Sequence, residues 1–162
     1  MNEIKIGSID AGDLSHEMEN KGLLVHKKGE GSLEFRFVYL GFPFAVSAEA
    51  GTKGSSIDIR SILGCLPYSS ESFQARQGAM KVLAAATGTL GQRVRLGKGQ
   101  RLEMSARRTS KDPLTPVNLV SIMAGILLEA KPFLDLLSEY LAVAPENKEA
   151  LAEAASNDDA IA

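Results

Sequence analysis

Hydrophobic and polar residues alternate along residues 32–41, SLEFRFVYLG, and again along residues 42–51, FPFAVSAEAG. This period of two is typical of strands with one buried face. Gly41 between the two runs predicts a tight connection. Runs at 23–27 and 56–64 predict two more strands. Because proline cannot donate a hydrogen bond within a sheet, Pro43 predicts that its strand is at an edge there or begins after it.

Helical spacing of apolar residues predicts two helices around these strands. Residues 9–22 predict a short helix that Asp10 can cap and that Gly22 ends. Residues 68–91 predict a longer, alanine-rich helix with Ser69 or Ser70 as its N-cap. Its apolar positions recur at helical spacing: Ala79, Val82, Leu83, Ala86 and Leu90. Since its alanines make one side thin, a sheet or another helix can approach it closely.

The strongest helical pattern begins at Thr115, a natural N-cap, followed by Pro116, a natural first helical residue. Pro132 predicts a kink or an interruption further along. Two apolar stripes run along this helix: Val120, Met123, Leu127, Ala130, Leu134, Leu137 and Leu141 form one, and Leu119, Ile122, Ile126, Phe133, Leu136 and Tyr140 form the other. Two apolar stripes are more than one face of a sheet can cover. The apolar surface left over predicts a second contact, either with another subunit or with a groove of a partner protein.

Between the two long helices, segments 92–96 and 102–106 predict a β-hairpin. If Gly97 faces Arg101, apolar residues face apolar residues and opposite charges face each other. The pairs are then Val94 with Met104, Arg95 with Glu103, and Leu96 with Leu102. The loop consists of residues 98–100, with Gly99 supplying an unusual backbone angle. A two-residue turn would instead put Leu96 opposite Arg101.

This hairpin region is the most charged part of the chain. Its candidate basic patch consists of Arg93, Arg95, Lys98, Arg101, Arg107, Arg108 and Lys111, and Glu103 is the one acid among them. Such a cluster is either a solvated sheet face or a site for phosphate or nucleic acid. The chain has no tryptophan and no aromatic residue between Phe73 and Phe133, so stacking on bases is disfavoured. The formal net charge of −2 also argues against nucleic acid.

The distribution of charge predicts the domain organisation. Residues 1–144 are long enough for a single domain with its own core. Residues 145–162 carry five acids and one base. They predict a mostly flexible tail with at most a turn or two of helix near Ala150, dispensable for folding. The amino terminus does not resemble a signal peptide, and no long uncharged apolar run predicts a membrane span. The expected location is the cytoplasm.

Few residues offer catalytic or metal-binding chemistry. His16 and His26 are the only histidines, and Cys65 is the only cysteine. A zinc site needs three or four converging ligands, which this set does not predict. Cys65 lies in the apolar sequence LGCLP, which favours an inert thiol over a nucleophile. We therefore expect no enzymatic activity, no metal and no cofactor.

The predicted order is helix, three or four strands, helix, two strands, helix, which defines an α+β fold with an antiparallel sheet of about five to six strands. This order resembles the type III secretion chaperones and their YbjN-like relatives. The likeness rests on the helix ARQGAMKVLAAATGTL, the hairpin QRVRLGKGQRLEMSA and the ending LTPVNLVSIMAGILLEAKPFLDLL. It implies a cytoplasmic homodimer without cofactors that holds an extended segment of another protein. The dimer would form partly through the alanine-rich helix.

Ala79, Leu83 and Ala86 are the candidate dimer-interface residues, although the same side chains could equally face the sheet. The sequence thus predicts a non-enzymatic protein-binding module with a chaperone-like or regulatory role. The alternative is a phosphate- or nucleic-acid-binding protein that uses the basic hairpin at residues 93–111.

Overall fold

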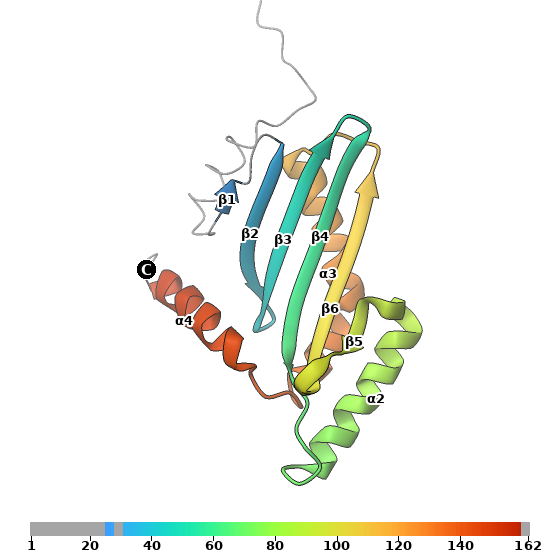
Figure 1. The fold of residues 1–162 in the computed structure, drawn as a ribbon, viewed down its shortest axis with the longest axis vertical. Helices are drawn as coiled ribbons and strands as arrows, with labels where there is room; N and C mark the ends of the chain where they lie inside the picture. The colour runs from blue at the N-terminus through green and yellow to red at the C-terminus, as the bar shows by residue number, and fades with distance from the viewer. Residues whose placement is uncertain (1–24, 28–30, 160–162) are drawn as a thin grey trace, which may run out of the picture.

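A six-stranded antiparallel sheet forms the centre of the protein in its computed structural model, which describes residues 25–27 and 31–159 (Figure 1). The strand order is β1-β2-β3-β4-β6-β5. The strands are β1 (Val25–Lys27), β2 (Ser32–Tyr39), β3 (Phe42–Gly51), β4 (Gly54–Cys65), β5 (Val94–Leu96) and β6 (Arg101–Ser110). The helices are α2 (Phe73–Leu90), α3 (Pro116–Leu137) and α4 (Pro145–Asp159). The predicted α+β class is confirmed, and the predicted helix at 9–22 lies outside the described residues.

The turn between β2 and β3 has the two-residue geometry that Gly41 predicts. Leu40 and Gly41 have φ values of 52° and 78°. Two successive positive values suit the right-handed twist of the flanking strands. The pairing joins Tyr39 with Phe42 and Val38 with Pro43.

Pro43 lies within β3, so the strand does not begin after it, but β3 is at an edge there, as the first of the two alternatives predicted. The ladder between β3 and β4 begins only at Ala45, which pairs with Arg60. Pro43 therefore lies outside the pairing between β3 and β4. That pairing would otherwise need a backbone N–H, which proline lacks. Its carbonyl accepts a hydrogen bond of 2.7 Å from the Ser61 hydroxyl.

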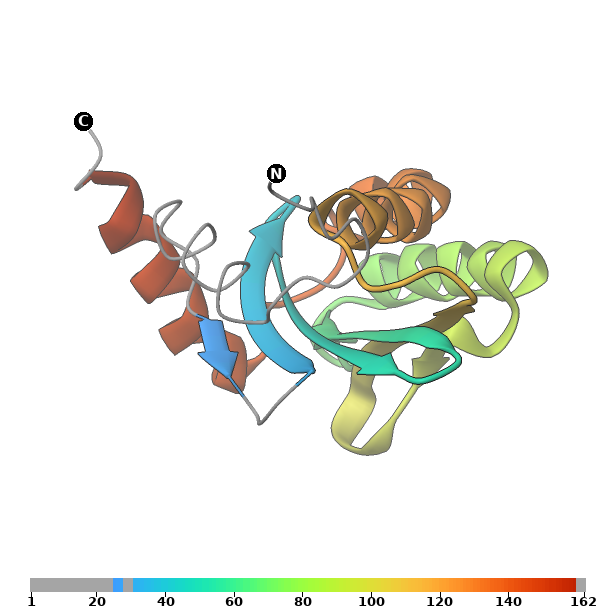
Figure 2. The ribbon, with the colours of Figure 1, turned by 90° about the horizontal axis from the view of Figure 1, so that it is seen from above.

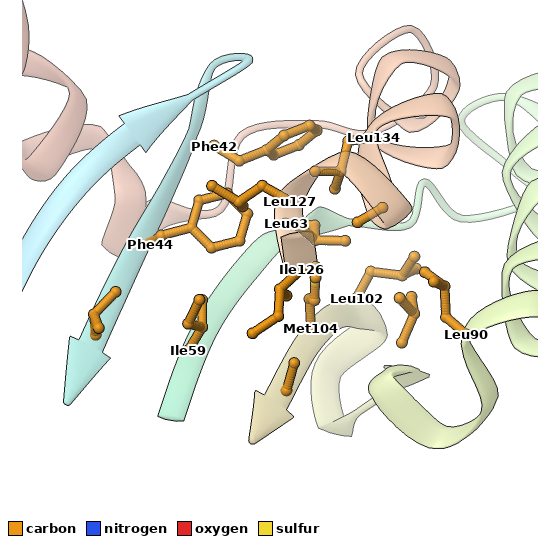
Figure 3. Close-up of a cluster of buried hydrophobic side chains, with 14 of the residues drawn as sticks. Phe42, Phe44, Ile59, Leu63, Leu90, Leu102, Met104, Ile126, Leu127 and Leu134 are labelled. Atoms are coloured by element: carbon orange, nitrogen blue, oxygen red, sulfur yellow. The ribbon is translucent and has the colours of Figure 1, made fainter. Parts of the chain in front are cut away.

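Helices α2 and α3 lie together on one face of the sheet (Figure 2). The close-up shows Phe42 and Phe44 of β3 beside Leu127 and Leu134 of α3 (Figure 3). All four of these side chains are buried. The core is therefore a two-layer contact between one sheet face and the helices.

The ends of these helices partly follow the predictions. Thr115 caps α3 by accepting from the Asn118 N–H, and Pro116 is its first residue. Helix α3 runs through Pro132 without interruption, so of the predicted kink or interruption the interruption is wrong. Ser72 caps α2, rather than Ser69 or Ser70, by accepting from the Ala75 N–H. The preceding residues form a turn instead, in which the Glu71 carboxylate accepts from the Tyr68 N–H.

The hairpin register is confirmed in full. Val94 pairs with Met104, Arg95 with Glu103, and Leu96 with Leu102. The Gly97 N–H donates to the Arg101 carbonyl at 2.7 Å, and Gly99 in the loop has a φ of 65°.

Residues 145–159 form helix α4, a longer helix than the predicted turn or two. It contacts β2 and β3, and it lies to the side of the sheet away from α2 in Figures 1 and 2. Ala144 and Asn147 at its beginning are buried. The Asn147 amide donates to the Ile62 carbonyl of β4 at 2.6 Å. The helix is therefore longer than predicted, and this hydrogen bond attaches its beginning to the body.

Candidate functional site

The basic residues of the hairpin region do not gather on one surface. Neighbouring residues in a strand point to opposite faces of the sheet. On the helix side, Arg93 donates to the Glu129 carboxylate of α3 at 2.6 Å, and Arg108 donates to it at 3.4 Å. The hydrogen bond from Arg93, together with the charges of Arg93 and Arg108, holds the pKa of Glu129 below its ordinary value. Two of the seven predicted cations are thus used in attaching α3 to the sheet.

Arg95 and Arg107 lie on the opposite face of the sheet. Helices α2 and α3 do not cover this face, and we call it the open face. Arg95 donates to Glu103 through two nitrogens, at 3.0 and 3.1 Å. Arg107 donates to the Ser56 hydroxyl at 3.3 Å, and its cross-strand neighbour Asp58 forms its ion pair with Arg60 instead. Arg101 opens β6, while Lys98 and Lys111 are exposed at the two ends of this region.

The open face of the sheet is hollowed into a groove of about 1030 Å³. Five arginines line it, together with Glu103: Arg36, Arg60, Arg95 and Arg107 come from four different strands, and Arg93 comes from the turn before β5. Arg60 donates to the Asp58 carboxylate at 2.7 Å, and this hydrogen bond and charge raise the pKa of Arg60. Since acids pair with Arg60 and Arg95, the groove has mixed charge rather than a continuous cationic surface.

The candidate interface residues of the alanine-rich helix are buried within the single chain. Ala79 and Ala86 are fully buried, and Leu83 is nearly so. They belong to the same hydrophobic core as the buried residues of α3. The sequence left open whether these side chains face a second subunit or the sheet. They face the core of their own chain, so the observed fold leaves them little surface for a partner.

Helix α3 instead presents apolar side chains to solvent. Val117, Val120 and Leu128 are 76%, 60% and 64% exposed. Their spacing places them on one side of the helix, and we call these three residues the outer stripe. By length and composition alone α3 could also cross a membrane, and only 28% of its most apolar 18-residue window is buried. Only Val120 of these three belongs to one of the two predicted stripes, and most stripe residues are buried or pack against the core. Exposed apolar surface is thus present on α3, but it lies mainly beside the predicted stripes.

Catalytic groups do not assemble among the described residues. No group of three His, Cys, Asp or Glu side chains in that part of the chain could hold a metal ion. Cys65 is half-buried, and its backbone bridges to Ala142 at the end of β4. His16 lies outside the described residues, as does the side chain of His26.

Comparison with known proteins returned no assignment: no protein-family model matches the chain, and no curated protein matches it.

Proposed function

We propose that this protein is a non-enzymatic protein-binding module with a chaperone-like or regulatory role. The observation that carries the proposal is the outer stripe of α3, formed by Val117, Val120 and Leu128. A soluble chain rarely leaves contiguous apolar surface of this kind without a use, and protein partners are the commonest one. The resemblance to type III secretion chaperones and YbjN-like proteins, read from the order of elements, supports the same class.

The outer stripe also supports self-association. A twofold dimer would bring one stripe against its own copy and cover both. The proposed dimer therefore uses the outward side of α3 and leaves the buried residues of α2 in the core. The proposed location is the cytoplasm, as the resemblance implies.

The alternative of phosphate or nucleic-acid binding has weaker support. Its seven cations are divided between the two faces of the sheet, and Arg93, Arg95 and Arg108 are already paired with carboxylates. Nucleic-acid binding through the remaining cations would weaken steeply as salt increases. Binding through the apolar outer stripe would persist at high salt.

Light scattering tests the proposal on the wild-type chain and on the double variant Val120→Glu/Leu128→Glu. We expect the wild type to have about twice the 17.3 kDa mass of one chain and the variant to have the mass of one chain. The variant Lys53→Glu, in the exposed turn between β3 and β4, controls for the added negative charge.

The same three proteins are then used to capture binding proteins from the native host at low and high salt. A wild-type mass of 17.3 kDa that does not change on concentration contradicts the dimer. Equal capture by the wild type and the double variant contradicts the outer stripe as the binding surface. Capture that is lost at high salt supports the nucleic-acid alternative.

A further inference from the structure

Strand β6 has an outer edge that is only partly paired. It pairs with β4 from Arg101 to Ser110, whereas β5 pairs with it only from Leu102 to Met104. Figure 1 shows no strand or helix beside the outer edge of β6 toward its Ser110 end. We call residues 105–110 along this side the free edge.

The direction of the backbone groups follows from the hairpin. The Arg101 carbonyl points toward β5, because it accepts from the Gly97 N–H at 2.7 Å. Backbone groups of alternate residues in an antiparallel strand point the same way. The N–H and C=O groups of Arg107 and Thr109 therefore point outward, and no strand pair in the described ranges covers them on this side. Ser105 points the same way, but it lies opposite Arg93 at the end of the ladder with β5.

A recess lies next to the free edge on the helix side. It has a volume of about 320 Å³ and lies between the end of β6 and the first turns of α3. Ser121 and Gly125 line it with small side chains, and Ile122 and Ile126 add apolar surface. A methyl group added at Gly125 would meet nothing within 4 Å. A strand lying along the free edge could therefore place an apolar side chain in this recess.

On the opposite side, the free edge presents Arg107 to the open face of the sheet. Asp58 of β4 lies opposite Arg107 in the ladder, but its carboxylate accepts from Arg60, and no ion pair of Arg107 is found within the described part of the chain. An acidic side chain opposite Arg107 on an added strand would complete a cross-strand pair of opposite charge.

A second copy of the same edge fits poorly. A twofold antiparallel pairing centred on the free edge would set Arg107 or Arg108 directly opposite its own copy. Like charges in that position are destabilising. Charged edge residues are a common protection against pairing with an identical edge.

We propose that the free edge of β6 binds an extended segment of a partner protein by strand addition. The segment alternates acidic residues, which face Arg107, with apolar residues, which face the recess between β6 and α3. Main-chain hydrogen bonds from Arg107 and Thr109 supply the affinity, and the two kinds of side chain supply the specificity. This inference rests on the proposed protein-binding function and assigns the partner segment to a surface separate from the outer stripe.

The probe is a capped seven-residue peptide of alternating glutamate and valine, added to the ¹⁵N-labelled full chain. The matched control peptide carries lysine in place of glutamate. We expect the glutamate peptide to shift the amide resonances of Arg107 and Thr109 and to slow their hydrogen exchange. The lysine peptide should bind at least about tenfold more weakly, since it places a cation opposite Arg107.

Thr109→Pro tests the main-chain contact, because it removes an outward N–H without removing a bond to β4. The matched control Thr109→Ala keeps that N–H. Proline should weaken peptide binding about tenfold or more, and alanine should leave it nearly unchanged. Arg107→Glu should reverse the preference between the two peptides, and it keeps the test valid if the proline variant does not fold.

Several results would overturn the inference. Peptide shifts confined to Val120 and Leu128 would place binding on the outer stripe. Equal binding of the two peptides, unchanged binding by Thr109→Pro, or no binding at all would remove the free edge as the site. A wild-type dimer that Thr109→Pro dissociates would show that a second copy occupies the edge. Failure of the proposed function is separate, since Val120→Glu/Leu128→Glu tests that surface and leaves the free edge intact.

Discussion

Helices α3 and α4 both follow the last strand in the chain, and they attach to the sheet in opposite ways. Helix α3 buries Leu119, Ile126 and Leu134 against the core and still exposes its outer stripe. Helix α4 is mostly polar and is attached at its beginning, where Asn147 hydrogen-bonds to β4. One helix is held by buried apolar area and the other by one specific hydrogen bond. The difference shows why apolar periodicity predicts α3 well and α4 poorly.

The largest expected effect lies on the buried side of α3. Ile126→Ala removes a side chain that is only 2% exposed and leaves a cavity between the helix and the sheet. We expect the free energy of unfolding to fall by about 2–5 kcal/mol. Urea denaturation followed by circular dichroism measures it. A loss below about 1 kcal/mol would mean that α3 is not packed on the sheet as described.

The next effect tests the attachment of α4. Asn147→Ala removes the 2.6 Å hydrogen bond to the Ile62 carbonyl, and we expect a loss of about 1–3 kcal/mol because that acceptor is left without a partner. Truncation after Ala144 should cost at least as much. Thermal melts of both variants against the wild type check this. An unchanged melting temperature for the truncated chain would show that residues 145–159 are dispensable for folding, as their charge predicted.

A smaller effect concerns the electrostatic link between the hairpin and α3. Glu129→Gln removes the carboxylate that Arg93 and Arg108 share. The pKa of Glu129 is lowered in the folded protein, so its ionised form contributes stability above its ordinary pKa, and this contribution is lost as pH falls through the lowered value. Because the pair is exposed, the difference should be small. Thermal melts of both proteins from pH 7 to pH 3 should converge at the acidic end, and a constant difference would contradict the link.

The smallest effect on stability is expected on the outer side of α3. Leu128→Ser changes a side chain that is 64% exposed, so the melting temperature of the isolated chain should stay almost the same. Its effect should appear in self-association instead, measured by sedimentation at several concentrations. A stability loss comparable to that of Ile126→Ala would show that the outer stripe is covered within the monomer.

Local pairing rules accounted for much of the fold. The hairpin register followed from three cross-strand pairs that agree only in one alignment, and the structure has that alignment. Thr115 and Pro116 marked the start of α3 because capping is a local property of the backbone. The candidate basic patch was found as a set of residues, but its division between two faces required the position of Glu129 on α3.

Other features depend on contacts far apart in the sequence. Asn147 binds a carbonyl on β4, and no local pattern announces that contact. Pro43 is tolerated in a central strand because the neighbouring ladder ends before it, which depends on the register between β3 and β4. The inward position of Ala79 required knowing where α3 lies. The free edge appears only when the observed lengths of β5 and β6 are compared, since the sequence predicted two strands of equal length at 92–96 and 102–106.

The order of the strands also has a consequence for the chain as it leaves the ribosome. Strand β4 follows its neighbour β3 directly, but its other neighbour is β6, and residues 66–100 separate the two. Until those residues are made, the side of β4 that will pair with β6 has no partner strand. Ile57 and Ile59 are buried in the finished fold, and α3, which covers this face of the sheet, is made last of the elements that form the core. Exposed strand edges and apolar faces are the usual sites of misassociation in nascent chains.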